Sequence, residues 1–433
     1  MLNPGYRAKG TAMFLSNKMA FQDGAAVDVT IVMPCLNEAQ SLPHCIANAR
    51  EAADRIHDIY GLACEIVIAD NGSTDGSQAI ATALGARVEP VTQRGYGAAL
   101  IGGCHGAYGR FILMGDCDGS YDFRDGVAMI GELVDGHALC MGSRFDGGIA
   151  PGAMPWKNRY IGNPVLTGIL NLFFRAGIND AHCGLRAIRK DSFLRLNLSG
   201  SGMEFASEMV IKAALLRLSI AQVPATLSPD LRDRAPHLRP WRDGWRHLRY
   251  LMMLAPNWLF GIPALLTLLI GLVVFGAAGV QALRPGTFPA IGDYWTILGA
   301  SLLGTGHLLL MMTGAGQVYA LREGYRQPGL LSRLVARWAT LEAMLVGGLG
   351  IFALGIGTLA LIYAEWTARH YQAADSIFLP MFSTLCLTLG TQTMFGGFLM
   401  AIIGGHQAKF VPKQQTLPLA RMSEPAVATA EMH

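Results

Sequence analysis

The sequence predicts an α/β domain with a mostly parallel sheet, followed by a membrane domain of four helices. Over the first half of the chain, short apolar runs alternate with helical patterns, which is typical of a sheet covered by helices. Most acidic residues precede about residue 245, and four long apolar blocks follow it. The chain of 433 residues is 52% hydrophobic and only 15% charged, a balance that indicates a membrane protein.

Five apolar runs in the first half predict the strands of the sheet. Between the first two runs, apolar residues such as Leu42, Cys45 and Ile46 recur at helical spacing. This alternation of strand and helix favours parallel pairing, and parallel sheets bind ligands at the carboxyl ends of their strands. The runs are VTIVMP (29–34), EIVIAD (65–70), ARVEPV (86–91), FILMGD (111–116) and ALCMGSR (138–144).

Polar clusters follow the carboxyl ends of four of these runs. Any single cluster has a purely structural interpretation, because a stretch such as 70–77 also suits a turn followed by a helix cap. Four clusters at one edge of a sheet instead predict a ligand-binding rim. They are Pro34 to Glu38 after the first run, Asp70, Asn71, Ser73 and Asp75 after the second, Asp116, Cys117 and Asp118 after the fourth, and Ser143 and Arg144 after the fifth.

The D-x-D pattern of Asp116 and Asp118 predicts a divalent metal site. Two carboxylates about 4 Å apart repel by roughly 4 kcal/mol at an effective dielectric near 20, so such a pair needs a cation or protons. The alternative is that one aspartate caps the next helix while the other faces water. The neighbouring clusters on the same rim favour the metal.

Four blocks in the second half are long enough to cross a bilayer, since about 20 helical residues span its roughly 30 Å core. They run from Trp258 to Val280, from Tyr294 to Gly314, from Ala343 to Tyr363 and from Ile377 to Ile403.

Basic residues near the span ends predict the orientation of the chain. Seven arginines and two lysines lie before the first span, between the second and third, and after the fourth, whereas the other two loops carry only Arg284 and Arg369. The positive-inside rule therefore places the first half and both chain ends in the cytoplasm. We expect an integral membrane protein, most simply of a bacterial inner membrane.

Five segments follow from this division. The first lacks the long apolar core of a signal peptide. We expect a flexible leader at 1–27, a cytoplasmic α/β domain at 28–229, a basic juxtamembrane segment at 230–256, four transmembrane helices at 257–405 and a flexible cytoplasmic tail at 406–433.

Six motifs follow one another along the chain, namely P-x-x-N-E, D-N-G-S-x-D, G-Y-G, D-x-D, G-S-R and DAHCGLRAIRK (180–190). This ordered set resembles that of family 2 glycosyltransferases with the GT-A fold, and the resemblance covers roughly residues 29–250. Within the family, the chain looks similar to polyprenyl-phosphate hexose synthases related to dolichol-phosphate mannose and dolichol-phosphate glucose synthase. Bacterial members of that group also append transmembrane helices.

The resemblance implies roles for individual residues. It assigns a nucleotide sugar to Pro34, Asn37, Glu38, Asp70, Ser73 and Asp116, and Mg²⁺ or Mn²⁺ to Asp116 and Asp118. The ion would neutralise the charge that develops on the departing nucleoside diphosphate. One position departs from the mannose synthases, which have a glutamine where this chain has Ser120. A hydroxyl is a poorer metal ligand, so Ser120 is not assigned to the ion.

The acceptor is expected to be a phosphate rather than a sugar hydroxyl. Polysaccharide synthases of family 2 carry T-E-D and Q-x-x-R-W motifs, which this sequence lacks. A phosphate monoester has a second pKa near 6 and needs cations more than a base. Arg232, Arg234, His237 and Arg239 precede the first span and would bind the lipid phosphate. Alternatively, these residues only set the membrane topology and attract anionic lipids.

Further side chains have expected roles at the rim. Arg144 and Arg186 are expected to bind phosphate and, with Asp116 and Asp118, to form the catalytic set, because the arginine fork matches phosphate oxygens. Asp180, Glu204 and Glu208 are candidates for positioning the sugar, although Glu204 and Glu208 suit ion pairs with Arg or Lys equally well.

The predicted partners follow from these roles. We expect a nucleotide sugar, with UDP-glucose favoured over GDP-mannose, a polyprenyl phosphate such as undecaprenyl or dolichyl phosphate, and membrane lipids. We also expect a homo-oligomer. The net charge of only +3 argues against a nucleic-acid partner.

Two competing hypotheses stay open from the sequence. One is transfer to a hydroxyl of a glycolipid or polysaccharide. The other is a scaffold or lipid-carrier translocator with an inactive transferase-like domain, which the intact D-x-D and arginine set argue against.

Overall fold

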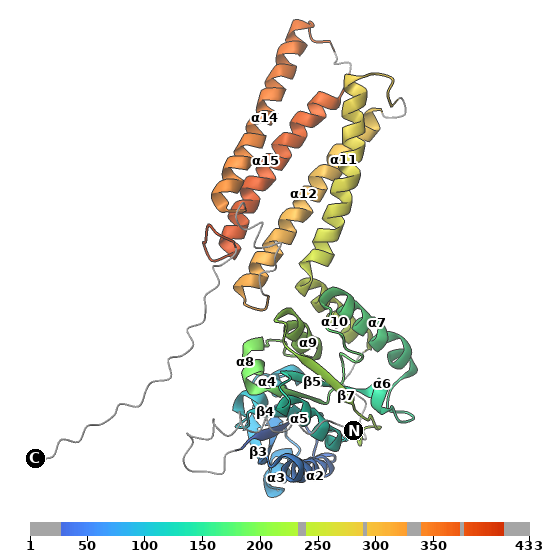
Figure 1. Cartoon of the computed structure of the whole chain (residues 1–433), viewed down its shortest axis with the longest axis vertical. Coiled ribbons are helices and arrows are strands. Elements are labelled where there is room, and N and C mark those ends of the chain that lie inside the picture. Colours follow the sequence, from blue (N-terminus) through green and yellow to red (C-terminus); the bar gives the residue numbers. More distant parts are fainter. Residues whose placement is uncertain (1–26, 233–239, 289–291, 327–338, 373–375, 411–433) are drawn as a thin grey trace, which may run out of the picture. The chain divides into compact units, whose positions relative to one another are not determined.

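The computed structural model describes residues 27–232, 240–288, 292–326, 339–372 and 376–410. The chain divides into two compact units, Met1–Met253 and Leu254–His433 (Figure 1). The predicted segment boundaries within these units stay predictions. Residues 1–26 of the expected leader and 411–433 of the expected tail lie outside the described residues.

A seven-stranded sheet forms the centre of the first unit, in the order β3-β2-β1-β4-β6-β5-β7. β6 runs antiparallel to its neighbours β4 and β5, and the other four strand pairs are parallel. This topology confirms the predicted mostly parallel sheet. The strands are β1 (Val29–Cys35), β2 (Cys64–Asp70), β3 (Arg87–Pro90), β4 (Phe111–Met114), β5 (Leu139–Ser143), β6 (Arg186–Arg189) and β7 (Ile220–Pro224).

All five strands predicted from apolar runs are present, and the sequence missed β6 and β7. β6 reads Arg-Ala-Ile-Arg, so only two of its four residues are apolar. It nevertheless lies between two strands and is almost completely buried. Neighbouring strands, rather than its own periodicity, therefore decide its conformation.

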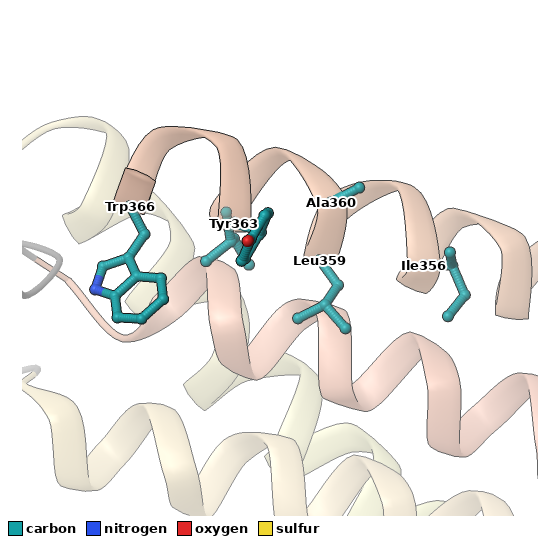
Figure 2. A pocket seen from close by; sticks show the side chains of 6 residues that line it. Ile356, Leu359, Ala360, Tyr363 and Trp366 are labelled. Carbon is teal, nitrogen blue, oxygen red and sulfur yellow. The ribbon is translucent and has the colours of Figure 1, made fainter. Parts of the chain in front are cut away.

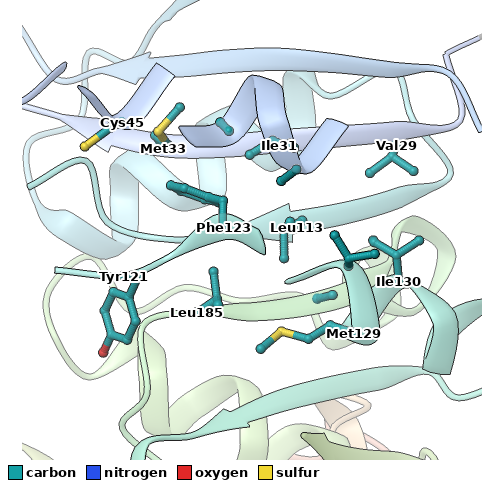
Figure 3. Packing of buried hydrophobic residues seen from close by; sticks show 14 of the residues in the cluster. Val29, Ile31, Met33, Cys45, Leu113, Tyr121, Phe123, Met129, Ile130 and Leu185 are labelled. Carbon is teal, nitrogen blue, oxygen red and sulfur yellow. The ribbon is translucent and has the colours of Figure 1, made fainter. Parts of the chain in front are cut away.

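Helices cover the sheet on both faces. α2 and α5 contribute to one apolar core with the side chains of Val29, Ile31 and Met33 (Figure 3). The intervening Val32 points to the opposite face, where a Cβ at Gly103 of α4 would lie only 2.7 Å from it. The helices are α2 (Leu42–Tyr60), α3 (Ser77–Ala83), α4 (Tyr96–Gly106), α5 (Gly126–Val134), α6 (Arg144–Gly147), α7 (Asn163–Phe174), α8 (Lys190–Leu196), α9 (Phe205–Leu215) and α10 (Pro240–Leu254), with the short turns η1 (Phe123–Asp125) and η2 (Asn158–Gly162).

Sequence signals set the ends of α2. Pro43 lies in its first turn, where its missing N–H costs nothing. Gly61 follows the helix in the left-handed conformation, with φ of 67°. The apolar face of α2 is buried, as its helical spacing predicts, which places the loop before it at the rim of the sheet.

The second unit consists of long apolar helices. Four of its helices are long and apolar enough to cross a membrane, which confirms the four predicted spans. They are η3 with α11 (Asn257–Gly261 and Ile262–Leu283), α12 (Asp293–Arg322), α14 (Leu341–Ala368) and α15 (Phe378–Ile403).

Glycines allow close packing of these helices. A Cβ at Gly348 of α14 would lie 2.8 Å from the carbonyl oxygen of Gly390 of α15, so the two backbones approach directly. A polar contact joins α12 to α15, because Nδ1 of His307 lies 2.9 Å from Oε1 of Gln392.

The surface of α14 also carries an apolar hollow of about 560 Å³ (Figure 2). It is lined by Ile356, Leu359, Ala360, Ile362, Tyr363 and Trp366. An apolar lining of this kind suits contact with hydrocarbon chains.

Candidate active site

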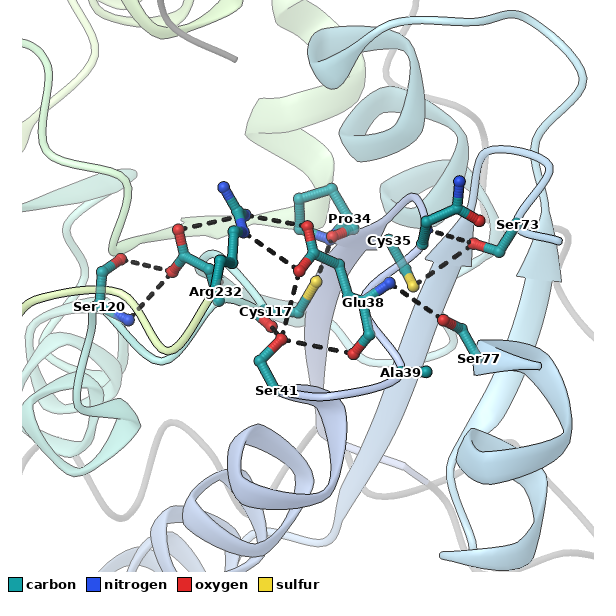
Figure 4. Close-up of polar contacts among 12 residues, drawn as sticks. Pro34, Cys35, Glu38, Ala39, Ser41, Ser73, Ser77, Cys117, Ser120 and Arg232 are labelled. Atoms are coloured by element: carbon teal, nitrogen blue, oxygen red, sulfur yellow. Dashed lines mark hydrogen bonds and ion pairs between the residues drawn. The ribbon is translucent and has the colours of Figure 1, made fainter. Parts of the chain in front are cut away.

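The loops after β1 and β2 are held together by side-chain hydrogen bonds. The backbone N–H of Asn37 donates to Oγ of Ser73 at 2.9 Å, and Oδ1 of Asn37 accepts from the N–H of Thr74 at 2.8 Å. The N–H of Glu38 donates to Oγ of Ser77 at 3.0 Å (Figure 4). Asn37 adopts a left-handed conformation with φ of 59°, which asparagine tolerates well. The structure thus brings the predicted nucleotide-binding residues of both loops to one edge.

Asp70 stabilises the turn that follows β2. Its carboxylate accepts hydrogen bonds from the N–H groups of Gly72 and Ser73 at 3.1 to 3.3 Å. The side-chain amide of Gln78 donates to Oδ2 of Asp70 at 2.6 Å. Because Asp70 is buried and has these partners, its contribution to a ligand site includes holding Ser73 in place.

The two D-x-D aspartates lie in different environments. Oδ1 of Asp118 accepts from the N–H of Ser120 at 3.0 Å and from its hydroxyl at 2.6 Å. Oδ1 of Asp116 is buried and has no hydrogen-bond partner. Burial, followed by the nearby charge of Asp118, raises the pKa of Asp116 to about 6. An orphaned carboxylate oxygen beside a second carboxylate fits a hard divalent cation such as Mg²⁺ or Mn²⁺.

The hydroxyl of Ser120 hydrogen-bonds to Asp118, which agrees with leaving it out of the metal ligands. Over the described residues, no group of three or more His, Cys, Asp or Glu side chains is placed to hold a metal. Asp116 and Asp118 stay the predicted protein ligands of the ion.

Gly184 makes room for the Asp116 carboxylate. A Cβ at this position would lie 2.6 Å from Oδ2 of Asp116 and 2.8 Å from the ring of Tyr121. The N–H of Gly184 donates to the hydroxyl of Tyr121 at 2.8 Å. Tyr96, from the G-Y-G turn, lies close to Asp116 and opposes the rise in its pKa. Sequence reasoning missed these supporting roles, although the glycines of C-G-L-R and G-Y-G were visible signals.

Arg232 lies between the first loop and the D-x-D pair (Figure 4). Its guanidinium lies 3.0 Å from Oε1 of Glu38 and 3.2 Å from Oδ2 of Asp118. Arg232 and Glu38 border a cavity of about 330 Å³. The cavity is lined by Asn37, Glu38, Ala39, Gln40, Ser41, Asp75 and Arg232. The other predicted lipid-phosphate residues, Arg234, His237 and Arg239, lie outside the described residues.

Arg144 and Arg186 are both buried with protein partners. Nε and Nη2 of Arg144 donate to the two carboxylate oxygens of Asp180 at 2.6 and 2.8 Å. The guanidinium of Arg186, only 2% exposed, donates to the carbonyls of Ala206 and Cys183. A phosphate contact by either arginine would compete with these bonds and stays a prediction.

The three carboxylates predicted to position the sugar also have partners within the protein. Glu208 is fully buried and pairs with Lys212 at 2.7 Å, the ion-pair alternative that the sequence left open. Glu204 lies just before α9, and its Oε1 accepts from the N–H of Gly202 at 2.9 Å. Asp180 pairs with Arg144. Burial alone would raise the pKa values of Asp180 and Glu208, but their cationic partners hold both below their ordinary values.

Two histidines flank a buried serine next to this region, and no sequence pattern pointed to them. Oγ of Ser207 lies 2.9 Å from Nδ1 of His247 and 3.3 Å from Nε2 of His182. Burial and the charge of His247 lower the pKa of His182 to about 3, so its ring is neutral at pH 7. The cluster connects α9 and α10 to the loop that carries Asp180.

Comparisons with known proteins agree with this architecture. Residues 30–196 match the family model described as "Glycosyl transferase family 2". Residues 314–404 match "Glycosyltransferase family 2 C-terminal transmembrane region".

Individual relatives and structures are also similar to the chain. The low-salt glycan biosynthesis hexosyltransferase Agl6 of Haloferax volcanii is 32% identical, over 88% of this chain and 90% of the relative. A dolichyl-phosphate hexose transferase of the same organism is 29% identical, over 46% of this chain and 81% of the relative. A solved structure of glucosyl-3-phosphoglycerate synthase from Mycobacterium tuberculosis, in complex with Mn²⁺, uridine diphosphate and glucosyl-3-phosphoglycerate, is 20% identical. It covers 54% of this chain and 84% of that chain with a TM-score of 0.39.

The extent of the Agl6 match, the two family models and the order of the motifs on the sheet lead to one assignment. The chain belongs to glycosyltransferase family 2, with a GT-A domain followed by the C-terminal transmembrane region of that family.

Proposed function

We propose that the chain transfers one hexose from a nucleotide sugar to a polyprenyl phosphate at the cytoplasmic face of a membrane, with Mg²⁺ or Mn²⁺ and with inversion at the anomeric carbon. The observation that carries the proposal is the D-x-D pair, in which a buried oxygen of Asp116 lacks a partner beside Asp118. UDP and glucose are the favoured donor nucleotide and hexose.

The donor would lie along the loops after β1 and β2. Asn37 and Ser73 are fixed by the hydrogen bonds between these loops, so little ordering is needed when a base and ribose bind. Glu38 and Arg232 border the adjacent cavity of about 330 Å³, a size that suits a small ligand. The diphosphate would then extend toward Asp116 and Asp118.

Asp116 and Asp118 would hold the divalent ion. When bound, the ion supplies Lewis-acid stabilisation of the departing nucleoside diphosphate. Tyr96 and Gly184 keep the Asp116 carboxylate in place, and Ser120 orients Asp118. These residues define where the diphosphate must lie before the hexose leaves.

The state of the nearby carboxylates supports a phosphate acceptor. Asp180 and Glu208 are buried in ion pairs, with pKa values held low, and are poor proton acceptors. A sugar hydroxyl must lose a proton as it attacks, whereas a phosphate dianion needs none removed. The similarity to a dolichyl-phosphate hexose transferase is consistent with a lipid-phosphate acceptor.

The four candidate spans would keep the enzyme at the surface where a polyprenyl phosphate resides. The distribution of basic residues favours a cytoplasmic catalytic domain. Arg234, His237 and Arg239 are proposed to meet the acceptor phosphate just before the first span. We also propose a homo-oligomer.

The decisive experiment incubates the purified full chain with labelled UDP-glucose, GDP-mannose or UDP-N-acetylhexosamine, with Mn²⁺ and undecaprenyl phosphate. A chloroform-soluble, acid-labile product bearing one hexose supports the proposal. Transfer only to a hydroxyl acceptor would replace it, and no lipid-linked product from any donor would favour the non-catalytic alternative.

A further inference from the structure

The position of Arg232 has a consequence for the metal site. Its guanidinium contacts two carboxylates from separate loops, with Nη2 lying 3.0 Å from Glu38 Oε1 and 3.2 Å from Asp118 Oδ2. Its Nε also donates to Oε2 of Glu38 at 3.1 Å. The side chains of Arg232, Glu38 and Asp118 are at most 17% exposed, so water screens these charges only weakly.

The oxygens of Asp118 are already divided between two partners. Oδ1 receives both hydrogen bonds from Ser120, and Oδ2 faces Arg232. An ion shared by Asp116 and Asp118 would therefore bind next to the guanidinium or on the same oxygen. Two cations in such a position repel each other, so the arginine and the ion compete for Asp118.

We propose that Arg232 acts as a stand-in cation beside Asp118 before the divalent ion and the donor bind. It leaves Asp118 when the divalent ion binds, and its guanidinium then binds the donor diphosphate. This inference rests on the proposed function and deepens it, because it assigns Arg232 to the donor rather than to the lipid phosphate.

The backbone before Arg232 explains how the side chain can exchange partners without leaving the site. The N–H of Ser228 donates to the carbonyl of Ser120 at 2.9 Å, and the N–H of Leu231 donates to the carbonyl of Asp118 at 2.8 Å. These bonds hold the segment 228–231 on the D-x-D loop. A rotation of the Arg232 side chain is then enough to move its fork from a carboxylate to a phosphate oxygen.

The charges that the ion and the donor bring would favour the move of Arg232 from Asp118 to the diphosphate. Before the ion and the donor bind, Arg232 lies against the carboxylates of Glu38 and Asp118. A divalent ion brings two positive charges to the aspartates, and a diphosphate brings new negative charge beside the cavity. The electrostatic attraction of the guanidinium to Asp118 consequently weakens, and its attraction to the diphosphate becomes the stronger one.

The test measures two affinities of the full chain in detergent. Mn²⁺ binding without nucleotide is followed by the electron paramagnetic resonance signal of free Mn²⁺, and nucleoside diphosphate binding is measured at saturating Mn²⁺, first with UDP and then with GDP. For Arg232→Gln we expect Mn²⁺ alone to bind about tenfold more tightly, and the nucleoside diphosphate about tenfold more weakly.

Two further variants sharpen the result. Arg124→Gln is the matched control, because Arg124 forms an exposed ion pair with Asp122 at 2.6 Å close to the same loop. It should change neither affinity. Arg232→Lys keeps the charge but lacks the fork, so we expect nearly wild-type Mn²⁺ binding and weakened nucleotide binding.

The opposite signs separate this role from a structural one. If Arg232→Gln only disturbed the packing of its segment, the affinities for Mn²⁺ and for the nucleoside diphosphate would both fall. That result would overturn the inference, and so would an unchanged Mn²⁺ affinity. Either outcome would leave the proposed metal function in place. If the wild-type chain binds no Mn²⁺ with or without nucleotide, the proposed metal function fails and the inference fails with it.

Discussion

The D-x-D loop and the region around Asp180 and α9 differ in whether their buried carboxylates have cationic partners. Asp180 and Glu208 each have a cationic partner, Arg144 and Lys212, within 2.7 Å. Asp116 instead faces a second carboxylate, and its Oδ1 has no partner. The first arrangement stabilises the folded chain at neutral pH. In the second, within the described part of the chain, only Asp118 has a cationic partner, Arg232, and an ionised Asp116 is destabilising until a divalent cation or a proton neutralises it. The comparison is consistent with our proposal that the D-x-D loop holds a divalent ion, and that the ion pairs around Asp180 and α9 stabilise the structure next to it.

The largest expected effect concerns activity in the D-x-D loop. Asp118→Asn and Asp116→Asn should each lower hexose transfer by at least about a hundredfold to a thousandfold, because each removes a charged ligand at the leaving group. Folding should survive. Asp116→Asn removes one of two repelling carboxylates, and in Asp118→Asn the asparagine oxygen can still accept the hydrogen bonds from Ser120 while Arg232 keeps its ion pair with Glu38. Transfer assays and thermal unfolding of the same preparations check both points. Full activity of either variant, or of the wild type in EDTA, would remove the metal role.

The second prediction concerns stability in the paired region. Asp180→Asn leaves the buried guanidinium of Arg144 without its counter-charge, so we expect a loss of about 3 to 5 kcal/mol in unfolding free energy. The double variant Asp180→Asn, Arg144→Gln should recover part of that loss. Unfolding by denaturant compares these variants with Asp116→Asn. A loss in Asp116→Asn as large as in Asp180→Asn would erase the difference between the two regions.

The third prediction uses the sign of the pKa shifts. The pKa of Asp116 is raised from 3.8 to about 6, so between these values the folded chain holds a proton that the unfolded chain has lost. In EDTA, the contribution of Asp116 to stability should therefore fall by about 2 to 3 kcal/mol as the pH rises from about 4 to 6. Asp180 has a lowered pKa and contributes in the opposite direction, with stability that is lost as the pH falls through its folded-state value.

The measurement is the difference in unfolding free energy between wild type and Asp116→Asn at each pH. In EDTA, the wild type should become less stable relative to Asp116→Asn as the pH rises from 4 to 6. At pH 7, added Mn²⁺ should reduce this difference. Parallel pH curves for the two proteins would contradict the raised pKa.

Particular residues show how far the sequence could predict this structure. The sequence was enough to predict the strands that are continuous apolar runs, the four spans and the D-x-D pair. Each of these features is encoded in a single short stretch of the chain. Arg144 and Arg186 were predicted as rim residues from their positions after or near strand ends. The sequence could not show that Asp180 pairs with Arg144, or that Arg186 bonds to the carbonyls of α9 and its own loop. Asp180 and Ala206 are distant in sequence from the arginines that they contact. Arg186 itself lies in β6, whose short and partly charged sequence carries no strand pattern.

The smallest expected effect distinguishes the two acceptor chemistries. Glu204 accepts one backbone hydrogen bond from Gly202 and lies outside the buried ion pairs. Glutamine keeps that acceptor oxygen, so Glu204→Gln should change the unfolding free energy by less than about 0.5 kcal/mol. If the acceptor is a phosphate dianion, no general base is needed, and turnover should stay within about twofold of the wild type. Glu208→Gln provides the contrast, since it should destabilise the chain by breaking the buried pair with Lys212. A Glu204→Gln variant that folds, binds donor and acceptor, and yet loses nearly all turnover would identify a general base. That outcome would favour a hydroxyl acceptor, because only such an acceptor has a proton to lose at the moment of attack.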